Sequence, residues 1–278
     1  MVSRRKRGFS LIEIAIVLFL MSIIVMATIK GKELIAKSRI AKAGQLTSNS
    51  PLKDLAEATL WFETTQDSSF KESEHENYVD LSSSDKALGM GSITKWYDRN
   101  PHPVKRKNSL ASSISQAPKY YQDCINKIPC LNFDGVQNHL TINNTSNLTL
   151  NDYSIFIVEK KNSDGELAIM GSDSNATKNI SLEIGYKKAD TIYWGQGASL
   201  SRREYKVANL AQNKPRLHSF INNSNKAGSS DVKYYLETSL IATTNPETPT
   251  TFLSTTLGSS LEIGKSGSSF YSGNIGEI

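Results

Sequence analysis

The residues near the amino terminus carry the most specific chemistry in the sequence. A basic stretch, residues 4–7, ends at Gly8, and Phe9 opens an almost unbroken apolar run that reaches Ile29. One carboxylate, Glu13, lies inside this run. A carboxylate in hydrocarbon costs about 3 kcal/mol, and such residues usually have a partner. The sequence therefore predicts an ion pair at Glu13, and the alternative is a neutral or interfacial side chain without a role.

The apolar run is long enough to cross a membrane. As a helix that rises 1.5 Å per residue, residues 9–29 extend about 32 Å, close to the roughly 30 Å hydrocarbon core of a bilayer. The basic leader favours the cytoplasmic side, and Lys30 and Lys32 end the run at the far side. A secretory signal places its small-residue cleavage site after the apolar core. Here Gly8 precedes the run, so cleavage at this point leaves the helix on the mature protein.

The helix should continue well beyond the membrane. Residues 30–46 keep an apolar stripe at helical spacing, and the residue before Pro51 is pushed out of the helical region. We therefore expect a stem helix within residues 9–50, about 60 Å long at 1.5 Å per residue. Ser50 and Pro51 suit the N-cap and first position of a further helix, so residues 51–58 are expected to form a short linker helix.

The order of these N-terminal residues resembles the leader of type IV prepilins and type II secretion pseudopilins. The resemblance implies that residues 1–8 are a leader, which a membrane-embedded prepilin peptidase removes by cutting after Gly8. It also implies N-methylation of Phe9, the new amino terminus. Glu13 would pair with that amino terminus in a neighbouring subunit, so that a buried charge is satisfied only in the assembled filament.

From residue 59 onward the pattern changes to short strands. Runs of about four to eight alternating or β-branched residues are separated by clusters of Asn, Ser, Gly and Asp. Such spacing is typical of a sandwich or jelly roll. The fold class expected is a long N-terminal α-helix, transmembrane in its first half, followed by an all-β jelly-roll sandwich over residues 59–278. The candidate strands are 59–64, 93–97, 130–133, 139–142, 153–160, 166–171, 180–185, 191–194, 216–221, 232–236, 239–242 and 260–264.

An ordered set of motifs in this region resembles the laminin-G/concanavalin-A-like jelly roll. The motifs are LWFE at 60–63, ITKWYDRN at 93–100, LNFDG at 131–135, LNDYSIF at 150–156, LEIG at 182–185, HSFI at 218–221, LEIG at 261–264 and YSGNIGEI at 271–278. Members of that superfamily bind glycans, proteins or calcium, or serve as spacers, and some relatives are glycosidases. They usually continue past the last motif. The resemblance therefore implies either a truncated C-terminal end, which we favour, or an incomplete last strand with an open sheet edge.

Several residues of this domain could contact a ligand. Trp194, beside Gly195, is the predicted exposed aromatic for ligand stacking, with a core position as the alternative, and Trp61 and Trp96 are predicted core residues. The oxygen-bearing residues that could together bind calcium are Asp98, Asn100, Asp134 and Asp152. Because Asp and Asn in loops often shape turns, a purely structural role is the alternative, and no other cofactor or metal is expected.

The two cysteines, Cys124 and Cys130, should form a disulfide. The intervening residues include Asn126, Lys127 and Pro129, which suit a hairpin turn that brings the sulfurs together. The prepilin resemblance places this region in the periplasm, an oxidising compartment. The absence of a His at ligand spacing argues against zinc.

Composition limits the functional classes. The net charge of +5 belongs to the leader and the stem, because removal of the leader leaves +1; nucleic acid is therefore not a predicted partner. The four histidines, His75, His102, His139 and His218, show no nucleophile–base spacing, and no paired-carboxylate strand of the glycosidase kind is present. The chain is not expected to be an enzyme.

Two functions fit these features. The first is a pilin-like subunit, minor rather than major, that displays a sandwich for adhesion or for glycan or protein recognition. Its partners would be the prepilin peptidase, other pilin subunits and the bacterial inner membrane, which it crosses once with the sandwich in the periplasm or on a surface pilus or pseudopilus. The alternative is a membrane-anchored lectin-like module outside any filament, and an anchored carbohydrate-active enzyme is a weaker one.

Overall fold

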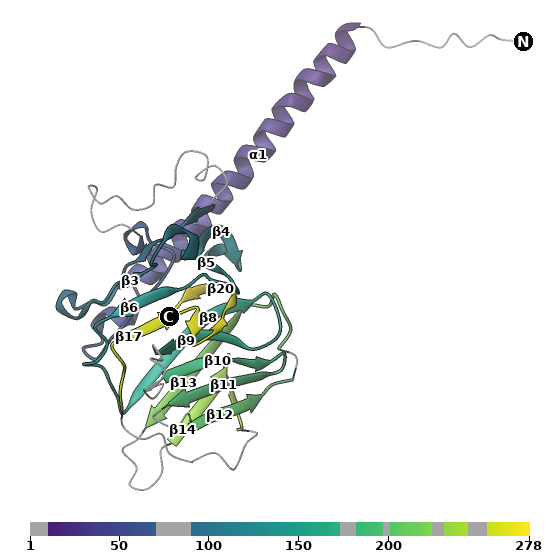
Figure 1. Cartoon of the computed structure of the whole chain (residues 1–278). Coiled ribbons are helices and arrows are strands. Elements are labelled where there is room, and N and C mark those ends of the chain that lie inside the picture. Colours follow the sequence, from purple (N-terminus) through teal and green to yellow (C-terminus); the bar gives the residue numbers. More distant parts are fainter. Residues whose placement is uncertain are drawn as a thin grey trace, which may run out of the picture.

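The computed structural model describes residues 11–70, 90–172, 182–196, 201–208, 210–223, 231–243 and 255–278. One long helix, α1 (Leu11–Ser48), projects from an antiparallel β-sandwich (Figure 1). The predicted fold class, an N-terminal helix followed by a jelly-roll-like sandwich, is confirmed.

The linker after α1 differs from the prediction. Ser50 is an N-cap, its hydroxyl accepts a hydrogen bond from the N–H of Leu52 at 3.3 Å, and Pro51 follows as expected. However, only η1 (Pro51–Asp54) forms, as a 3₁₀ turn, and Leu55 is already extended. The predicted helix over 51–58 is wrong in extent, because so short a segment cannot offset the cost of helix nucleation without a packed apolar face.

Two eight-stranded sheets make up the sandwich. The first has the order β1-β4-β5-β20-β8-β13-β14-β15, and the second has the order β12-β11-β10-β9-β17-β6-β3-β2. The strands of the first sheet are β1 (Met90–Ser92), β4 (Lys119–Ile125), β5 (Ile128–Asp134), β20 (Ser272–Glu277), β8 (Tyr153–Lys161), β13 (Arg216–Asn223), β14 (Asp231–Leu236) and β15 (Ser239–Ile241). Those of the second are β12 (Ser201–Lys206), β11 (Thr191–Gln196), β10 (Leu182–Lys188), β9 (Leu167–Ser172), β17 (Ser260–Ile263), β6 (Leu140–Asn143), β3 (Ser109–Leu110) and β2 (Lys95–Trp96).

Short elements complete the described part of the domain. Two further strand pairs form, β7 (Thr149–Leu150) with β16 (Thr255–Thr256) and β18 (Lys265–Ser266) with β19 (Ser269–Phe270). The 3₁₀ turns are η2 (Asp67–Ser69), η3 (Pro103–Lys105) and η4 (Ile114–Gln116). The apolar core between the sheets includes Trp96, Phe133, Ile157, Trp194 and Phe220, all fully or almost fully buried. Trp61 and Trp96 are core residues, as predicted.

The last strand lies inside a sheet and not at its edge. β20 pairs with β5 on one side and with β8 on the other. Phe62 and Ile278 exchange two backbone hydrogen bonds of 2.9 Å, and Glu63 forms an isolated bridge with Glu277. The less favoured alternative, an open edge at this strand, is therefore wrong, because β20 has a paired strand on each side.

Candidate assembly helix and binding residues

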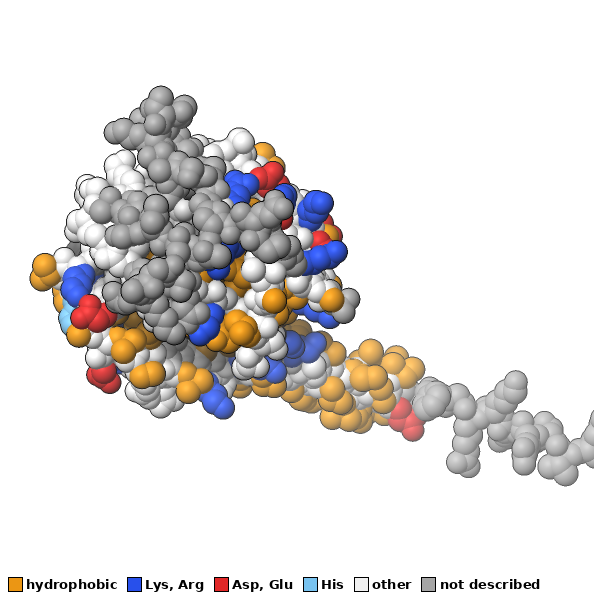
Figure 2. All heavy atoms as spheres, turned by 90° about the horizontal axis from the view of Figure 1, so that it is seen from below, with side chains coloured by type: hydrophobic (Ala, Val, Ile, Leu, Met, Phe, Trp, Pro, Cys, Tyr) orange, Lys and Arg blue, Asp and Glu red, His pale blue; other side chains and the backbone are white. Residues whose placement is uncertain are grey.

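The first half of α1 is apolar on every side and packs against nothing in the described chain. All residues from Leu11 to Lys30 are exposed, and Figure 2 shows hydrophobic side chains along the visible face of the projecting helix. Among the described residues, α1 is the one helix long and apolar enough to cross a membrane. A helix at the surface of a soluble protein buries one apolar stripe, whereas a helix that is apolar all round belongs in lipid or in a protein interior.

Glu13 is the only charged described residue before Lys30. It lies in the first turn of α1 as described, where a carboxylate also faces the positive end of the helix dipole. Its side chain is exposed. The predicted cleavage and methylation residues, Gly8 and Phe9, lie outside the described residues.

Beyond the apolar segment, α1 becomes basic. Glu33 accepts a hydrogen bond from Lys37 at 2.8 Å and lies 3.6 Å from Lys30. The hydrogen bond and charge of Lys37, with the charge of Lys30, lower the pKa of the Glu33 carboxyl. Within the helix itself, one carboxylate of this stripe thus pairs with two lysines.

The end of α1 docks on the sandwich through one narrow stripe. Ile40, Ala43, Gly44, Thr47 and Ser48 are half-buried, whereas the neighbouring positions 41, 42, 45 and 46 are exposed. The hydroxyl groups of Thr47 and Thr65 lie 2.9 Å apart, and Gln66 Nε2 donates to Ser48 Oγ at 2.9 Å. Gly44 permits this approach, because a Cβ there would lie 3.3 Å from the carbonyl oxygen of Thr65. The preceding residues 11–39, all exposed except the half-buried Gly31, extend for about 43 Å at 1.5 Å per residue.

A comparison with known families matches this region of the chain. Residues 3–29 fit the family model described as the prokaryotic N-terminal methylation motif. The chain carries a prepilin-type N-terminus. The match includes Gly8, Phe9 and Glu13 and most of the exposed apolar segment, so the prepilin-type helix and the membrane-anchoring helix are the same element.

Comparisons of the remaining chain give little. No curated protein matches the sequence. One solved structure with a similar arrangement is the carbohydrate-binding module CBM66 from Bacillus subtilis, which is 18% identical, covers 54% of this chain and 83% of its own, and has a TM-score of 0.32. A likeness at this level assigns no ligand to the sandwich.

The predicted stacking residue, Trp194, is not exposed. Its side chain is 0% exposed, and its ring packs edge-on against Phe220 at 5.3 Å and Tyr153 at 6.0 Å. The prediction of an exposed aromatic is wrong, because every residue of β11 is buried and the Trp194 ring packs against residues of the other sheet. The weighed alternative, a core position, is correct.

Asp98 and Asn100 hold a loop together. Asp98 is almost fully buried and accepts hydrogen bonds from the N–H groups of Trp61, Asn100 and Lys107, at 2.8–2.9 Å. Burial raises the pKa of the Asp98 carboxyl, although these three backbone donors oppose the rise. Asn100 donates to the carbonyl groups of Ala58 and Thr59 at 2.8 Å each. Both side chains therefore fasten the segment after the stem to the sandwich.

The two other predicted calcium ligands lie elsewhere. One oxygen of Asp134 accepts from the N–H groups of residues 136, 137 and 138, which makes it a turn residue. Asp152 lines a shallow hollow of about 500 Å³ between the start of β8 and the end of β13. No group of three or more His, Cys, Asp or Glu side chains in the described ranges is arranged to hold a metal ion. The four predicted ligands are thus not brought together.

The predicted disulfide is present. Cys124 and Cys130 are bonded across the hairpin of β4 and β5, with their Cα atoms 5.8 Å apart. Asn126 and Lys127 form the turn, and both have positive φ, at 50° and 63°. This is the arrangement of a type I′ hairpin turn, which matches the strand twist.

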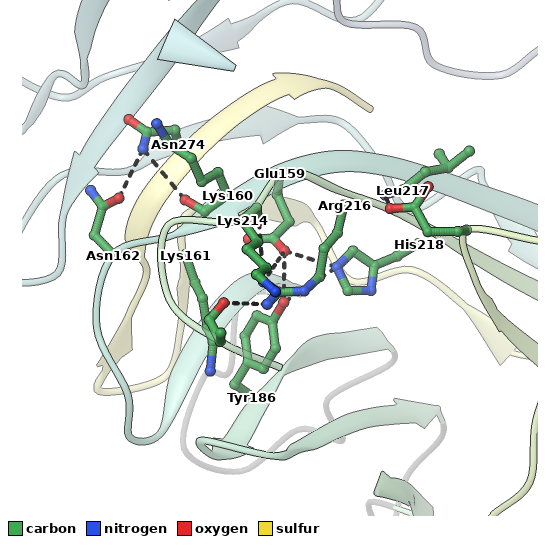
Figure 3. Close-up of polar contacts among 12 residues, drawn as sticks. Glu159, Lys160, Lys161, Asn162, Tyr186, Lys214, Arg216, Leu217, His218 and Asn274 are labelled. Carbon is green, nitrogen blue, oxygen red and sulfur yellow. Dashed lines mark hydrogen bonds and ion pairs between the residues drawn. The ribbon is translucent and has the colours of Figure 1, made fainter. Parts of the chain in front are cut away.

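A buried polar network that the sequence did not reveal joins the two sheets. Glu159 on β8 and His218 on β13 are both 0% exposed, and Glu159 Oε1 lies 2.9 Å from His218 Nε2 (Figure 3). Tyr186, on β10 of the opposite sheet, donates to the same oxygen at 2.7 Å, and Tyr271 donates to the other oxygen. Arg216 adds a positive charge 3.7 Å from Glu159. Every oxygen of this carboxylate thus has a partner in the same chain.

The electrostatics of this network follow from burial and pairing. Burial alone would raise the pKa of the Glu159 carboxyl, but the hydrogen bond and charge of His218 and the two tyrosine hydroxyl groups hold it below its usual value. Burial, followed by the charge of Glu159, raises the pKa of Tyr186 and of Tyr271 well above the usual value. Because the group is closed to solvent, it does not form an open site, and its hydrogen bonds join the two sheets.

The remaining histidines do not add to this group. His139 contacts the carbonyl oxygen of Gln137 at 2.8 Å, and His102 caps η3 without a side-chain hydrogen bond. His75 lies outside the described residues.

Proposed function

We propose that the protein is a pilin-like subunit. In this proposal a prepilin peptidase cuts after Gly8, Phe9 is N-methylated, and α1 crosses the bacterial inner membrane with the sandwich in the periplasm. Assembly then proceeds through α1 into a type IV pilus or a type II secretion-type filament. The observation that carries the proposal is that the methylation motif at residues 3–29 runs directly into a helix whose apolar surface nothing in the described chain covers.

The sandwich is proposed to serve recognition at the filament surface. Among the described residues it contacts α1 through the end of the helix, so a length of about 43 Å, at 1.5 Å per residue, remains for packing with other stems. A domain of this size on every subunit would hinder that packing, which favours a minor subunit. Adhesion through a glycan or a surface protein is the role we propose for the sandwich, with no reaction assigned to it.

The test is the mature amino terminus. We would express the full chain with its prepilin peptidase and determine the N-terminal peptide by mass spectrometry, beside Gly8→Leu and the matched control Ser10→Ala. A start at methyl-Phe9 in wild type and in the control, and an intact leader in Gly8→Leu, is the expected result. An intact leader in wild type would refute the proposal and leave a membrane-anchored binding module outside any filament.

A further inference from the structure

The stretch of α1 between the membrane and the sandwich presents a second stripe, which we call the basic stripe. It consists of Lys32, Ile35, Arg39, Lys42 and Leu46, all exposed, with Ile35 and Leu46 at 54% and 66%. Their spacing alternates between three and four residues, which is the spacing of a helix–helix seam. At 3.6 residues per turn the basic stripe lies about 130° around the helix from the docked residues 40–48. The sandwich therefore leaves this seam open.

The charges of the basic stripe are not neutralised by any residue that the structure describes. Lys30 and Lys37 pair with Glu33 on another face of α1, whereas Lys32, Arg39 and Lys42 form no salt bridge with any described residue. Two apolar side chains and three cations thus share one seam. Burying such a seam against another helix requires carboxylates opposite the cations, since unpaired charges are costly to desolvate.

A second copy of this helix cannot provide those carboxylates. Glu13 and Glu33 are the only acidic residues in α1. Glu33 already pairs with two lysines, and Glu13 is assigned by the proposed function to the amino terminus of a neighbour. Parallel packing of two identical stems, at any stagger, therefore leaves the cations of the basic stripe without three matching anions.

Lipid headgroups fit the basic stripe less well than an acidic helix does. The hydrocarbon edge lies near Ile29, and Lys42 is about 20 Å further along the axis at 1.5 Å per residue. The headgroup layer adds only about 5–7 Å on each side, and charges are screened over about 8–10 Å. Lys32 can reach the headgroups, but Arg39 and Lys42 project beyond them.

We propose that the basic stripe binds the stem helix of a different pilin-like subunit, one that carries carboxylates at matching seam positions. This inference rests on the proposed function and deepens it, because it makes the subunit heterotypic: its nearest stem neighbour on this face is not a copy of itself. Charge complementarity along the seam would then select the partner and fix its register.

A charge-reversed variant of this chain can serve as the acidic partner helix in a binding test. We would co-express the tagged full-length wild type with an untagged full-length variant, Lys32→Glu/Arg39→Glu/Lys42→Glu, which offers an acidic seam, and measure co-purification from membranes in mild detergent. Pairing of wild type with this variant should exceed wild type with wild type by about tenfold, since three surface ion pairs contribute. The gain should disappear at high salt. The matched control is Lys53→Glu/Lys119→Glu/Lys188→Glu, which makes the same charge change on exposed residues outside the stripe.

Two results would overturn the inference. Equal pairing in all combinations, with anionic phospholipid lost from the charge-reversed variant, would assign the basic stripe to lipid headgroups. An equal gain with the control variant would show unspecific attraction between opposite charges. Leader processing is determined in the same samples, so failure of cleavage at Gly8 refutes the proposed function separately, because pairing of uncleaved chains still reports on the stripe.

Discussion

At the scale of single residues, two carboxylates of this chain lie in low-dielectric surroundings and differ in where their partners come from. Glu159 is fully buried, and its oxygens contact His218, Tyr186 and Tyr271 within the sandwich. Glu13 lies in an apolar helix that belongs in lipid, and the proposed assembly satisfies it through the amino terminus of another subunit. A carboxylate in a low-dielectric setting stabilises a structure only when it is paired, so the first pair should matter for folding and the second for assembly.

The prediction for Glu13 separates assembly from membrane insertion. In Glu13→Ala the apolar helix is unchanged and the site at Gly8 is intact, so membrane insertion and leader cleavage should match wild type. Incorporation into filaments should fall at least about tenfold, because the loss of one interfacial charge pair exceeds about 1.4 kcal/mol. Quantitative immunoblotting of sheared filaments and of membranes measures both quantities. Normal incorporation of Glu13→Ala would contradict the pairing.

The prediction for Glu159 concerns stability and its pH dependence. The pKa of this carboxyl is lowered in the folded state, so its contribution is present above the unfolded pKa, about 4.3, and is lost as pH falls through the folded value. Glu159→Gln should lower the free energy of unfolding by about 3 kcal/mol at pH 7 and remove this part of the acid dependence below about pH 4.3. Denaturant titrations of the full chain in detergent, followed by fluorescence of the buried tryptophans, measure both effects.

A matched control for that experiment is Glu166→Gln, on a side chain that is 54% exposed. It should change the free energy of unfolding by less than about 0.5 kcal/mol. Equal stabilities of Glu159→Gln and wild type across this pH range would show that the network does not hold the sheets together.

Single residues are also where the sequence was least informative. The glycines beside Trp194 predict an exposed ring, yet all six residues of β11 are buried. Whether both faces of a strand are covered depends on its tertiary neighbours, which the sequence does not show. Glu159 was missed although it shares the inward face of β8 with Ile157 and Lys161. Two charged residues at successive inward positions of β8, Glu159 and Lys161, were the available signal. The sequence could not show the partners of Glu159, because His218 and Tyr186 lie on other strands.

At the scale of elements, long periodic segments were predictable and short or polar ones were not. The helix that ends at Ser48 and the inner strands β8, β9, β11 and β13 match the expected ranges within a few residues. The candidate strands omit β4, which mixes polar and aromatic residues, and β12, which is mostly polar. They treat β20, whose glycines lower strand propensity, only as a truncated or incomplete last strand. These strands form because neighbouring strands supply their hydrogen-bond partners. The sequence alone does not show which strands are neighbours.

The hairpin of β4 and β5 carries the element-scale prediction. Its disulfide closes a loop with a sequence separation of 6, so the chain-entropy gain is modest, about 2 kcal/mol. Cys124→Ser/Cys130→Ser should lower the free energy of unfolding by about that amount, and the wild type under reducing conditions should show the same loss. A stability unchanged in both cases would mean that the turn at Asn126 and Lys127 holds the hairpin without the bond.

At the scale of the whole molecule, the two ends of the sandwich meet where the stem enters. Phe62 exchanges backbone hydrogen bonds with Ile278, and the indole N–H of Trp61 donates to Glu277 Oε1 at 2.8 Å. Thr64 donates to the carbonyl oxygens of Pro129 and Gly276. A pull transmitted along the stem therefore reaches the last strand through this small set of contacts, beside the docking of Thr47 and Ser48 on residues 65 and 66.

Removing Glu277 and Ile278 tests this connection. The pairing of β20 with β5 involves residues 272–275 and stays intact, so the sandwich should still fold. The truncated chain should lose about 2–3 kcal/mol of stability, because two backbone hydrogen bonds and the Trp61 contact disappear. Limited proteolysis between residues 49 and 64 should become faster before any cleavage within the sheets. Unchanged proteolysis would place the mechanical connection elsewhere, for example at Asp98 and Asn100.

The matched variant, Glu277→Gln, should act in the opposite direction, and its sign follows from titration. Burial, with the nearby Glu63, raises the pKa of Glu277 in the folded state although the Trp61 hydrogen bond opposes this. A carboxyl whose folded pKa is raised costs stability when it is ionised, and the cost is relieved as pH falls through that pKa toward the unfolded value near 4.3.

An amide at position 277 keeps the acceptor for the Trp61 indole N–H without the charge. Glu277→Gln should therefore be of order 1 kcal/mol more stable than wild type at pH 7, with the difference vanishing near pH 4 in the same denaturant titrations. A loss of stability at pH 7 would show that the charge of Glu277 itself binds the stem segment to the sheet.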